Sequence, residues 1–72
     1  MNIKKLKSKM ALFGDTGGDL ANYLEISRST LSAKMNSTNG AEFVQSEILK
    51  IKKRYLLNNE EVDEIFFEGK VS

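Results

Sequence analysis

The chain has 72 residues, a length that holds a single domain, and it contains neither cysteine nor histidine. Disulfides are therefore excluded, a zinc site lacks its usual ligands, and the commonest general base and thiol nucleophile are both missing. We expect no enzyme, no metal and no cofactor. No apolar run approaches the roughly 20 residues of a membrane span, and no apolar stretch follows the basic start to make a secretory signal, so we expect a cytoplasmic protein.

The net charge of +1 hides two regions of opposite sign. Residues 1–59 hold ten Lys and Arg against five Asp and Glu, whereas residues 60–72 hold one Lys and five acids. A basic body with an acidic end fits a surface that faces phosphate groups and an end that faces away from them. A charged surface that is merely solvated gives the same pattern, and this reading stays open.

The spacing of apolar residues is helical almost throughout, and the first two helices are predicted at residues 2–13 and 16–25. Gly14 follows the first of them, as is typical of a glycine that ends a helix. Thr16 and Asp19 stand at the spacing of a capping box at the start of the second.

Three further helices are predicted at residues 28–36, 45–55 and 59–67. Ser27 is a good N-cap for the first of these, and residues 37–40 form a polar turn after it. Val44 has no acceptor to cap the next helix, whereas Asn58 and Glu61 have capping-box spacing before the last. We therefore predict an all-α fold, a compact bundle of five short helices in one domain over residues 1–72.

Residues 16–36 have the pattern of a helix, a tight turn and a second helix. The small Ala21 leaves room where two steeply crossing helices approach closely. Ile26 fills the turn, and Leu31 holds the second helix against the first. This is the packing expected of a helix-turn-helix motif.

Residues 20–32 (LANYLEISRSTLS) resemble the phage repressor family of Cro/CI type, also called XRE or lambda-repressor-like, whose motif reads Leu-Ala-x-x-Leu-Gly-Ile-Ser-x-x-x-Ile/Leu-Ser. Residues 55–67 are similar to the end of its small phage members. Two positions depart from the family. Glu25 stands where the turn usually has glycine, so either Glu25 adopts a left-handed conformation or the turn is rearranged. Gly17 stands where the family often has glutamine, which removes a phosphate contact.

The resemblance implies a transcription regulator that inserts its third helix into the major groove of an operator. It places Arg28, Ser29 and Ala33 at the base edges, with Thr30 and Ser32 nearby. Arg28 suits guanine, and the Ala33 methyl suits thymine. Backbone contacts are expected from Thr16, Ser27, Lys34, Asn36 and Asn39. The alternative for each of these side chains is an ordinary surface residue in a solvated helix. The lysines of the first helix and residues 50 and 52–54 are expected to form solvated faces, with a contact to DNA as the alternative for both groups.

Phe66 and Phe67 are adjacent, so on a helix one ring enters the core while the other points outward. An outward Phe67 predicts a homodimer interface, with Phe66 beside it, although both rings closing over a small core is the alternative. A dimer would bind a pseudopalindromic double-stranded operator, with half-sites about 34 Å apart. No small-molecule ligand is expected. The alternative function is a protein–protein adaptor that retains the helix-turn-helix fold without specific DNA binding.

Overall fold

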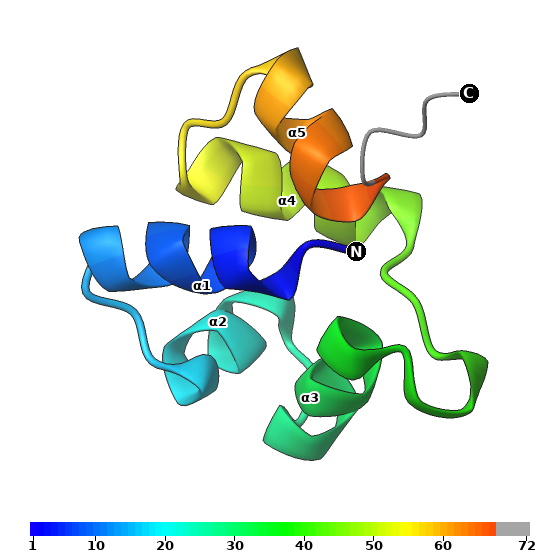
Figure 1. The fold of residues 1–72 in the computed structure, drawn as a ribbon. Helices are drawn as coiled ribbons and strands as arrows, with labels where there is room; N and C mark the ends of the chain where they lie inside the picture. Colours follow the sequence, from blue (N-terminus) through cyan, green and yellow to red (C-terminus); the bar gives the residue numbers. More distant parts are fainter. Residues whose placement is uncertain (68–72) are drawn as a thin grey trace.

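The computed structural model describes residues 1–67, and this part of the chain contains five α-helices and no β-strand (Figure 1). The helices are α1 (Ile3–Leu12), α2 (Gly17–Leu24), α3 (Arg28–Asn36), α4 (Gln45–Arg54) and α5 (Asn59–Phe66), with a 3₁₀ turn η1 (Thr38–Gly40) after α3. The predicted all-α bundle of five short helices is confirmed. None of these helices is long and apolar enough to cross a membrane.

The helix bounds follow from local capping. Side-chain oxygens of Asn2, Thr16, Ser27 and Asn58 each accept a hydrogen bond from the amide three residues later, at the starts of α1, α2, α3 and α5. At α4 the amide of Val44 instead donates to the Glu47 carboxylate, 3.0 Å away. Because the caps lie outside the helices, four of the five helices are one or two residues shorter than predicted, and α3 has its predicted bounds.

One hydrophobic core joins all five helices. Figure 1 shows α1 between the α4–α5 pair on one side and the α2–α3 pair on the other, so α1 supplies apolar residues to both. The predicted roles of Ala21, Leu31, Met10 and Met35 as packing residues are confirmed, because all four are buried. The buried core residues are Leu6, Met10, Leu20, Ala21, Leu24, Leu31, Met35, Ile51, Tyr55, Leu57 and Ile65.

Ion pairs join helices that are distant in the chain, and they correct part of the sequence analysis. Lys5 pairs with Glu64, and Lys9 pairs with Glu61 at 2.7 Å, so two lysines of α1 contact the acidic helix α5. Arg54 forms two hydrogen bonds with Asp15. The Lys5–Glu64 pair is exposed and agrees with a solvated face, whereas the predicted solvated face is wrong for Lys9 and Arg54, whose side chains are only 23% and 29% exposed. Their acidic partners lie 39 or more positions away in the chain, which no local pattern can indicate.

Candidate nucleic-acid interface

The turn between α2 and α3 consists of residues 25–27 and depends on a left-handed residue. Glu25 has φ 60° and ψ 41°, so the first of the two alternatives for this position is the one found. Its conformation lets the amide of Ile26 donate to the carbonyl of Ala21, at 3.0 Å. The left-handed conformation costs a non-glycine residue about 1–2 kcal/mol. This conformation turns the backbone at the end of α2, so that α3 packs across α2.

Helix α3 has one buried side and one exposed side. Leu31 and Met35 point into the core and fix the rotation of the helix about its axis. The side chains of Arg28, Ser29, Thr30 and Ser32 are exposed, and Ala33 is half-buried. All five side chains that the sequence analysis assigned to base contacts therefore come from α3, with the serine and threonine hydroxyl groups exposed on its surface.

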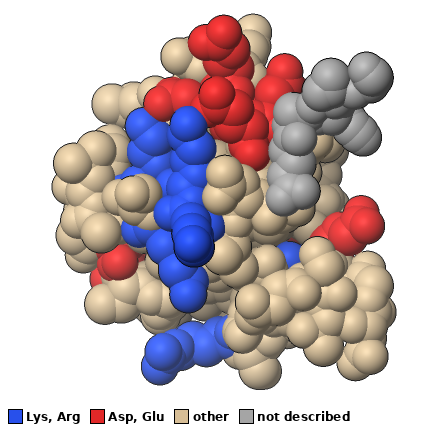
Figure 2. Space-filling view, in the orientation of Figure 1, with Lys and Arg blue, Asp and Glu red and all other residues tan. Residues whose placement is uncertain are grey.

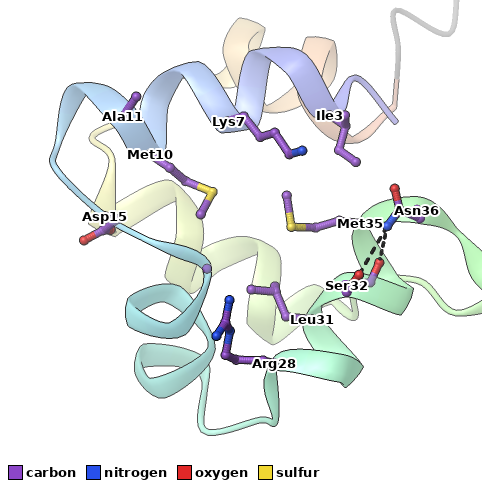
Figure 3. A pocket seen from close by; sticks show the side chains of 11 residues that line it. Ile3, Lys7, Met10, Ala11, Asp15, Arg28, Leu31, Ser32, Met35 and Asn36 are labelled. Carbon is purple, nitrogen blue, oxygen red and sulfur yellow. Dashed lines mark hydrogen bonds between the residues drawn. The ribbon is translucent and has the colours of Figure 1, made fainter.

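Arg28 lies across the first turn of α2. A Cβ atom at Gly18 would stand 3.7 Å from Cδ of Arg28 and 3.7 Å from the hydroxyl oxygen of Thr16, so these two predicted contact residues meet at Gly18. In Figure 3 the Arg28 guanidinium rises from the start of α3 toward α1. Arg28 forms no hydrogen bond or ion pair within residues 1–67. It is thus the exposed cation of α3 that no carboxylate neutralises.

Hydrogen bonds between neighbouring residues fix the orientation of the polar side chains of α3. The Ser27 hydroxyl accepts from the amide of Thr30 and donates to the Thr30 hydroxyl, at 3.1 and 2.8 Å. At the other end of the helix the Asn36 amide group donates to the carbonyl and hydroxyl oxygens of Ser32. The hydroxyl groups therefore stand in defined positions, and each retains bonding capacity toward a ligand.

Lys34 differs from the other predicted backbone contacts because its charge is already paired. Its ammonium group lies 2.8 Å from the Glu47 carboxylate, and the side chains of this pair are only 15% and 13% exposed. The same ammonium also donates to the carbonyl of Glu42. A phosphate contact by Lys34 thus requires release from Glu47. Asn39, in contrast, is exposed in η1, where it has φ 53°.

The basic side chains of α1 adjoin the acidic side chains of α5 and are partly neutralised by them. Figure 2 shows a band of basic side chains over α1, further basic groups near α2 and α3, and acidic side chains gathered over α5. In Figure 1 the helices α3 and α5 lie on opposite sides of α1. The acidic residues of α5 thus lie on the other side of α1 from α3, whereas two exposed acids, Asp19 in α2 and Glu25 in the turn before α3, lie close to it.

The two phenylalanines at the end of α5 have different surroundings. Phe66 is half-buried and meets Phe43 edge-to-face, with ring centroids 5.6 Å apart. Phe67 is 47% exposed. The predicted split into an inward and an outward ring is confirmed, and a role of either ring in a dimer stays a prediction.

A polar cluster around Asp15 was not predicted from the sequence. Arg54 donates to both carboxylate oxygens of Asp15 and stacks over the Tyr23 ring at 4.6 Å, and the Tyr55 hydroxyl donates to Asp15 at 2.7 Å. The hydrogen bonds from Arg54 hold the pKa of Asp15 below its usual value, and burial raises the pKa of Tyr55 above its usual range. Every group in the cluster is satisfied, so we assign it a structural role.

Comparisons with known proteins give no indication of the function, so we infer it from this geometry. No family model matches the chain, and no curated protein or solved structure shows significant similarity to it. Within residues 1–67 no group of three or more potential metal-ligating side chains could hold a metal ion. The exposed side of α3 is the polar surface on which a function can be proposed.

Proposed function

We propose that this protein binds double-stranded DNA sequence-specifically, with α2 and α3 acting as a helix-turn-helix and α3 as the recognition helix. The observation that supports this proposal most directly is the exposed side of α3. One unpaired cation, Arg28, stands there at the first turn, and the hydroxyl groups of Ser29, Thr30 and Ser32 stand beside it. Arginine and hydroxyl side chains near the start of a helix are the groups that read base edges in the major groove.

The dimensions of α3 fit this role. A helix of nine residues is about 13–14 Å long, and the major groove, about 12 Å wide, admits an α-helix. Arg28 would turn away from Gly18 and donate two hydrogen bonds to O6 and N7 of guanine. Ser29 would bond to either kind of base, and the methyl group of Ala33 would contact thymine. Thr30 and Ser32 would lie at the edges of the contact.

Backbone contacts would hold α3 in register. Thr16 and Ser27 lie at the starts of α2 and α3, where backbone amide groups favour phosphate. Asn36 is the last residue of α3, and Asn39 follows it in η1. Lys34 would join them after leaving Glu47. The acidic residues of α5 lie on the other side of α1, so they would face away from the DNA.

A protein of this kind regulates transcription by occupying an operator. We propose the Cro- or CI-like repressor type, as in phages and prophages, because the motif at residues 20–32 resembles that family. Two copies joined through the exposed Phe67 would place two α3 helices on a pseudopalindromic site. Such pairing would raise affinity above that of one weakly basic domain.

Selection from a pool of random duplexes tests the proposal. The full chain is titrated by fluorescence anisotropy at 50 and 200 mM salt, conditions between which several phosphate contacts produce a large loss of affinity, and the bound fraction is sequenced. Enrichment of a two-fold-symmetric site, with affinity that falls as salt rises, supports an operator-binding regulator. Salt-sensitive binding without enrichment indicates a protein that binds DNA non-specifically, and it contradicts the proposed sequence readout.

A protein–protein adaptor is the second candidate, and the ion pairs favour it. Lys5, Lys9, Lys34 and Arg54 are all neutralised by carboxylates, which reduces the positive charge available to DNA. An adaptor that binds through apolar surface would show no DNA binding even at the lower salt concentration. Its association with a protein partner would also change little with salt.

A further inference from the structure

A groove of about 420 Å³ runs between α1 and α3. Its floor is apolar and consists of Met10, Leu31 and Met35, and Ile3 closes one end. Ser32 and Asn36 add polar groups at the rim, on the α3 side (Figure 3). The volume lies within the range of pockets that hold small organic molecules, and methionine side chains adapt readily to the shape of a ligand.

Two cations line this groove from opposite sides. Lys7 extends from α1 into it, and Arg28 extends toward it from α3 (Figure 3). Neither side chain forms a hydrogen bond or an ion pair within the described residues 1–67. Asp15 is the acidic residue of the lining, but its carboxylate accepts hydrogen bonds from Arg54 and Tyr55. The groove therefore combines an apolar floor with an uncompensated positive charge.

We propose that this groove binds a small amphipathic anion. The apolar part of the ligand would lie on Met10, Met35 and Leu31, and its carboxylate would lie between the Lys7 ammonium and the Arg28 guanidinium. Charge complementarity selects this occupant, because an anion can pair with both exposed cations, whereas a neutral apolar molecule would leave them paired only with water. A carboxylate accepts charge-assisted hydrogen bonds from both groups and matches the planar arrangement of the guanidinium donors.

Ligand binding in the groove would also regulate DNA binding, a consequence that rests on the proposed function. Arg28 cannot hold the ligand and donate to a guanine at the same time. The ligand would therefore lower the affinity for the selected DNA site, and that DNA would lower the affinity for the ligand by the same factor. Ligand binding in the groove and DNA binding by α3 would then both take place within residues 1–67.

Methionine methyl groups provide a direct probe of the groove. The sequence has three methionines, of which Met10 and Met35 line the groove and Met1 does not. The full chain labelled with ¹³C at the methionine methyls is titrated with octanoate by NMR, and octanamide serves as the neutral control of equal length. We expect octanoate to shift the signals of Met10 and Met35 and to leave Met1 unchanged, with octanamide binding at least tenfold more weakly.

Equal shifts with octanoate and octanamide would overturn the proposal, because the two cations would then contribute nothing. Shifts at Met1 that match those at Met10 would overturn it as well, because binding would not be confined to the groove. No shift up to 10 mM octanoate is a third result against it.

Charge-removing variants locate the anion. Lys7→Gln and Arg28→Gln should each weaken octanoate binding about tenfold, the loss expected for one charge-assisted hydrogen bond. Lys50→Gln, on the exposed surface of α4, is the matched control and should bind octanoate as the unaltered chain does. If Lys50→Gln weakens binding as much as Lys7→Gln does, the attraction comes from the overall charge and the groove is not its site.

Competition with DNA separates this proposal from the proposed function. Octanoate at saturation should lower the affinity for a selected duplex at least tenfold, whereas octanamide should not. If the methionine signals report octanoate but no duplex is bound, the groove site stands and the DNA-binding proposal fails. If the duplex binds and octanoate fills the groove without changing the affinity for DNA, the regulatory link is overturned and the ligand site remains.

Discussion

Asp15 and Arg54 stand 39 positions apart in the chain and form a bidentate ion pair, with Nε and Nη2 of Arg54 lying 2.6 and 2.8 Å from the two carboxylate oxygens of Asp15. The pair joins the loop between α1 and α2 to the end of α4. The Tyr55 hydroxyl adds a third hydrogen bond to the same carboxylate, so one acidic side chain connects two halves of the bundle.

Asp15→Asn should lower the free energy of unfolding by about 1–3 kcal/mol, because the amide keeps the shape of the carboxylate but loses the charge and one acceptor. The Asp15 side chain is only 8% exposed, so water replaces the lost hydrogen bonds poorly. Urea unfolding followed by circular dichroism at pH 7 measures the change. Asp63→Asn, on the exposed surface of α5, is the matched control and should change stability little.

The stability difference between the unaltered chain and Asp15→Asn should depend on pH. The hydrogen bonds from Arg54 lower the pKa of folded Asp15 below its ordinary value of 3.8. Its contribution to stability is therefore fully present above that value and is lost as the pH falls through the lower pKa of the folded state. A difference that stays constant from pH 7 to pH 2 would show that the Asp15 carboxylate does not contribute to stability through its charge.

Local signals in the sequence were sufficient for the helices but not for the contacts between them. Thr16, Ser27 and Asn58 mark three helix starts in the sequence because an N-cap acts within three residues of itself. Arg54 was misassigned to a solvated face because its partner is distant in the chain, and no spacing rule connects positions 39 apart. Only the arrangement of the whole bundle brings that pair together.

Glu25→Gly should raise the free energy of unfolding by about 0.5–1 kcal/mol, because glycine adopts the left-handed conformation of this position without steric cost. Leu56→Gly should act in the same direction, because Leu56 also has a positive φ, of 52°, and is 79% exposed. Thermal and urea unfolding measure both variants. Lys50→Gly, within α4, should instead destabilise by about 0.5–1 kcal/mol.

The Lys34–Glu47 pair should show a coupling energy of about 1 kcal/mol in a double-mutant cycle of Lys34→Met and Glu47→Gln, since both side chains are largely buried. Urea unfolding of the four proteins measures it, and a coupling energy of zero would contradict the ion pair.

The same variants test Lys34 as a phosphate contact. Glu47→Gln releases the Lys34 ammonium and should tighten DNA binding on all sequences alike, whereas Lys34→Met should weaken it evenly. If Glu47→Gln leaves the DNA affinity unchanged, the backbone contact assigned to Lys34 is wrong.

The candidate site could be placed on α3 from sequence, but its internal contacts could not. Leu31 and Met35 set the buried side of the helix by their spacing, and the exposed position of Ser29 and Ser32 follows from it. That spacing cannot indicate that Lys34 turns to Glu47, because the partner lies on another helix. The position of Arg28 over Gly18 likewise depends on how α2 and α3 cross.

Arg28→Ala should weaken binding to a selected duplex about 10- to 100-fold and relax the preference at one base pair of each half-site, because a bidentate contact to guanine contributes about 1–3 kcal/mol. Anisotropy titrations on the selected site and on single-base variants of it measure both effects. Lys53→Ala, on the exposed surface of α4, should leave the preference unchanged. Equal losses on all duplexes for Arg28→Ala would contradict base reading by this residue.

Phe67→Ala should shift any dimer toward monomer, because the exposed ring is the proposed contact between copies. Sedimentation velocity over a range of protein concentrations measures the shift. Leu12→Ala is the control, since Leu12 is 75% exposed at the end of α1 and belongs to no proposed interface. An unchanged profile for Phe67→Ala beside a dimeric unaltered chain would contradict the assignment.

Amide NMR of the full ¹⁵N-labelled chain, titrated with a 20-base-pair duplex at low salt, tests most directly the claim that α3 reads DNA. We expect the largest shifts or line broadening on residues 27–33 and at the start of α2, and little change in α5. Binding that leaves the α3 signals unmoved and instead shifts those of α4 or α5 would show that α3 is not the recognition helix.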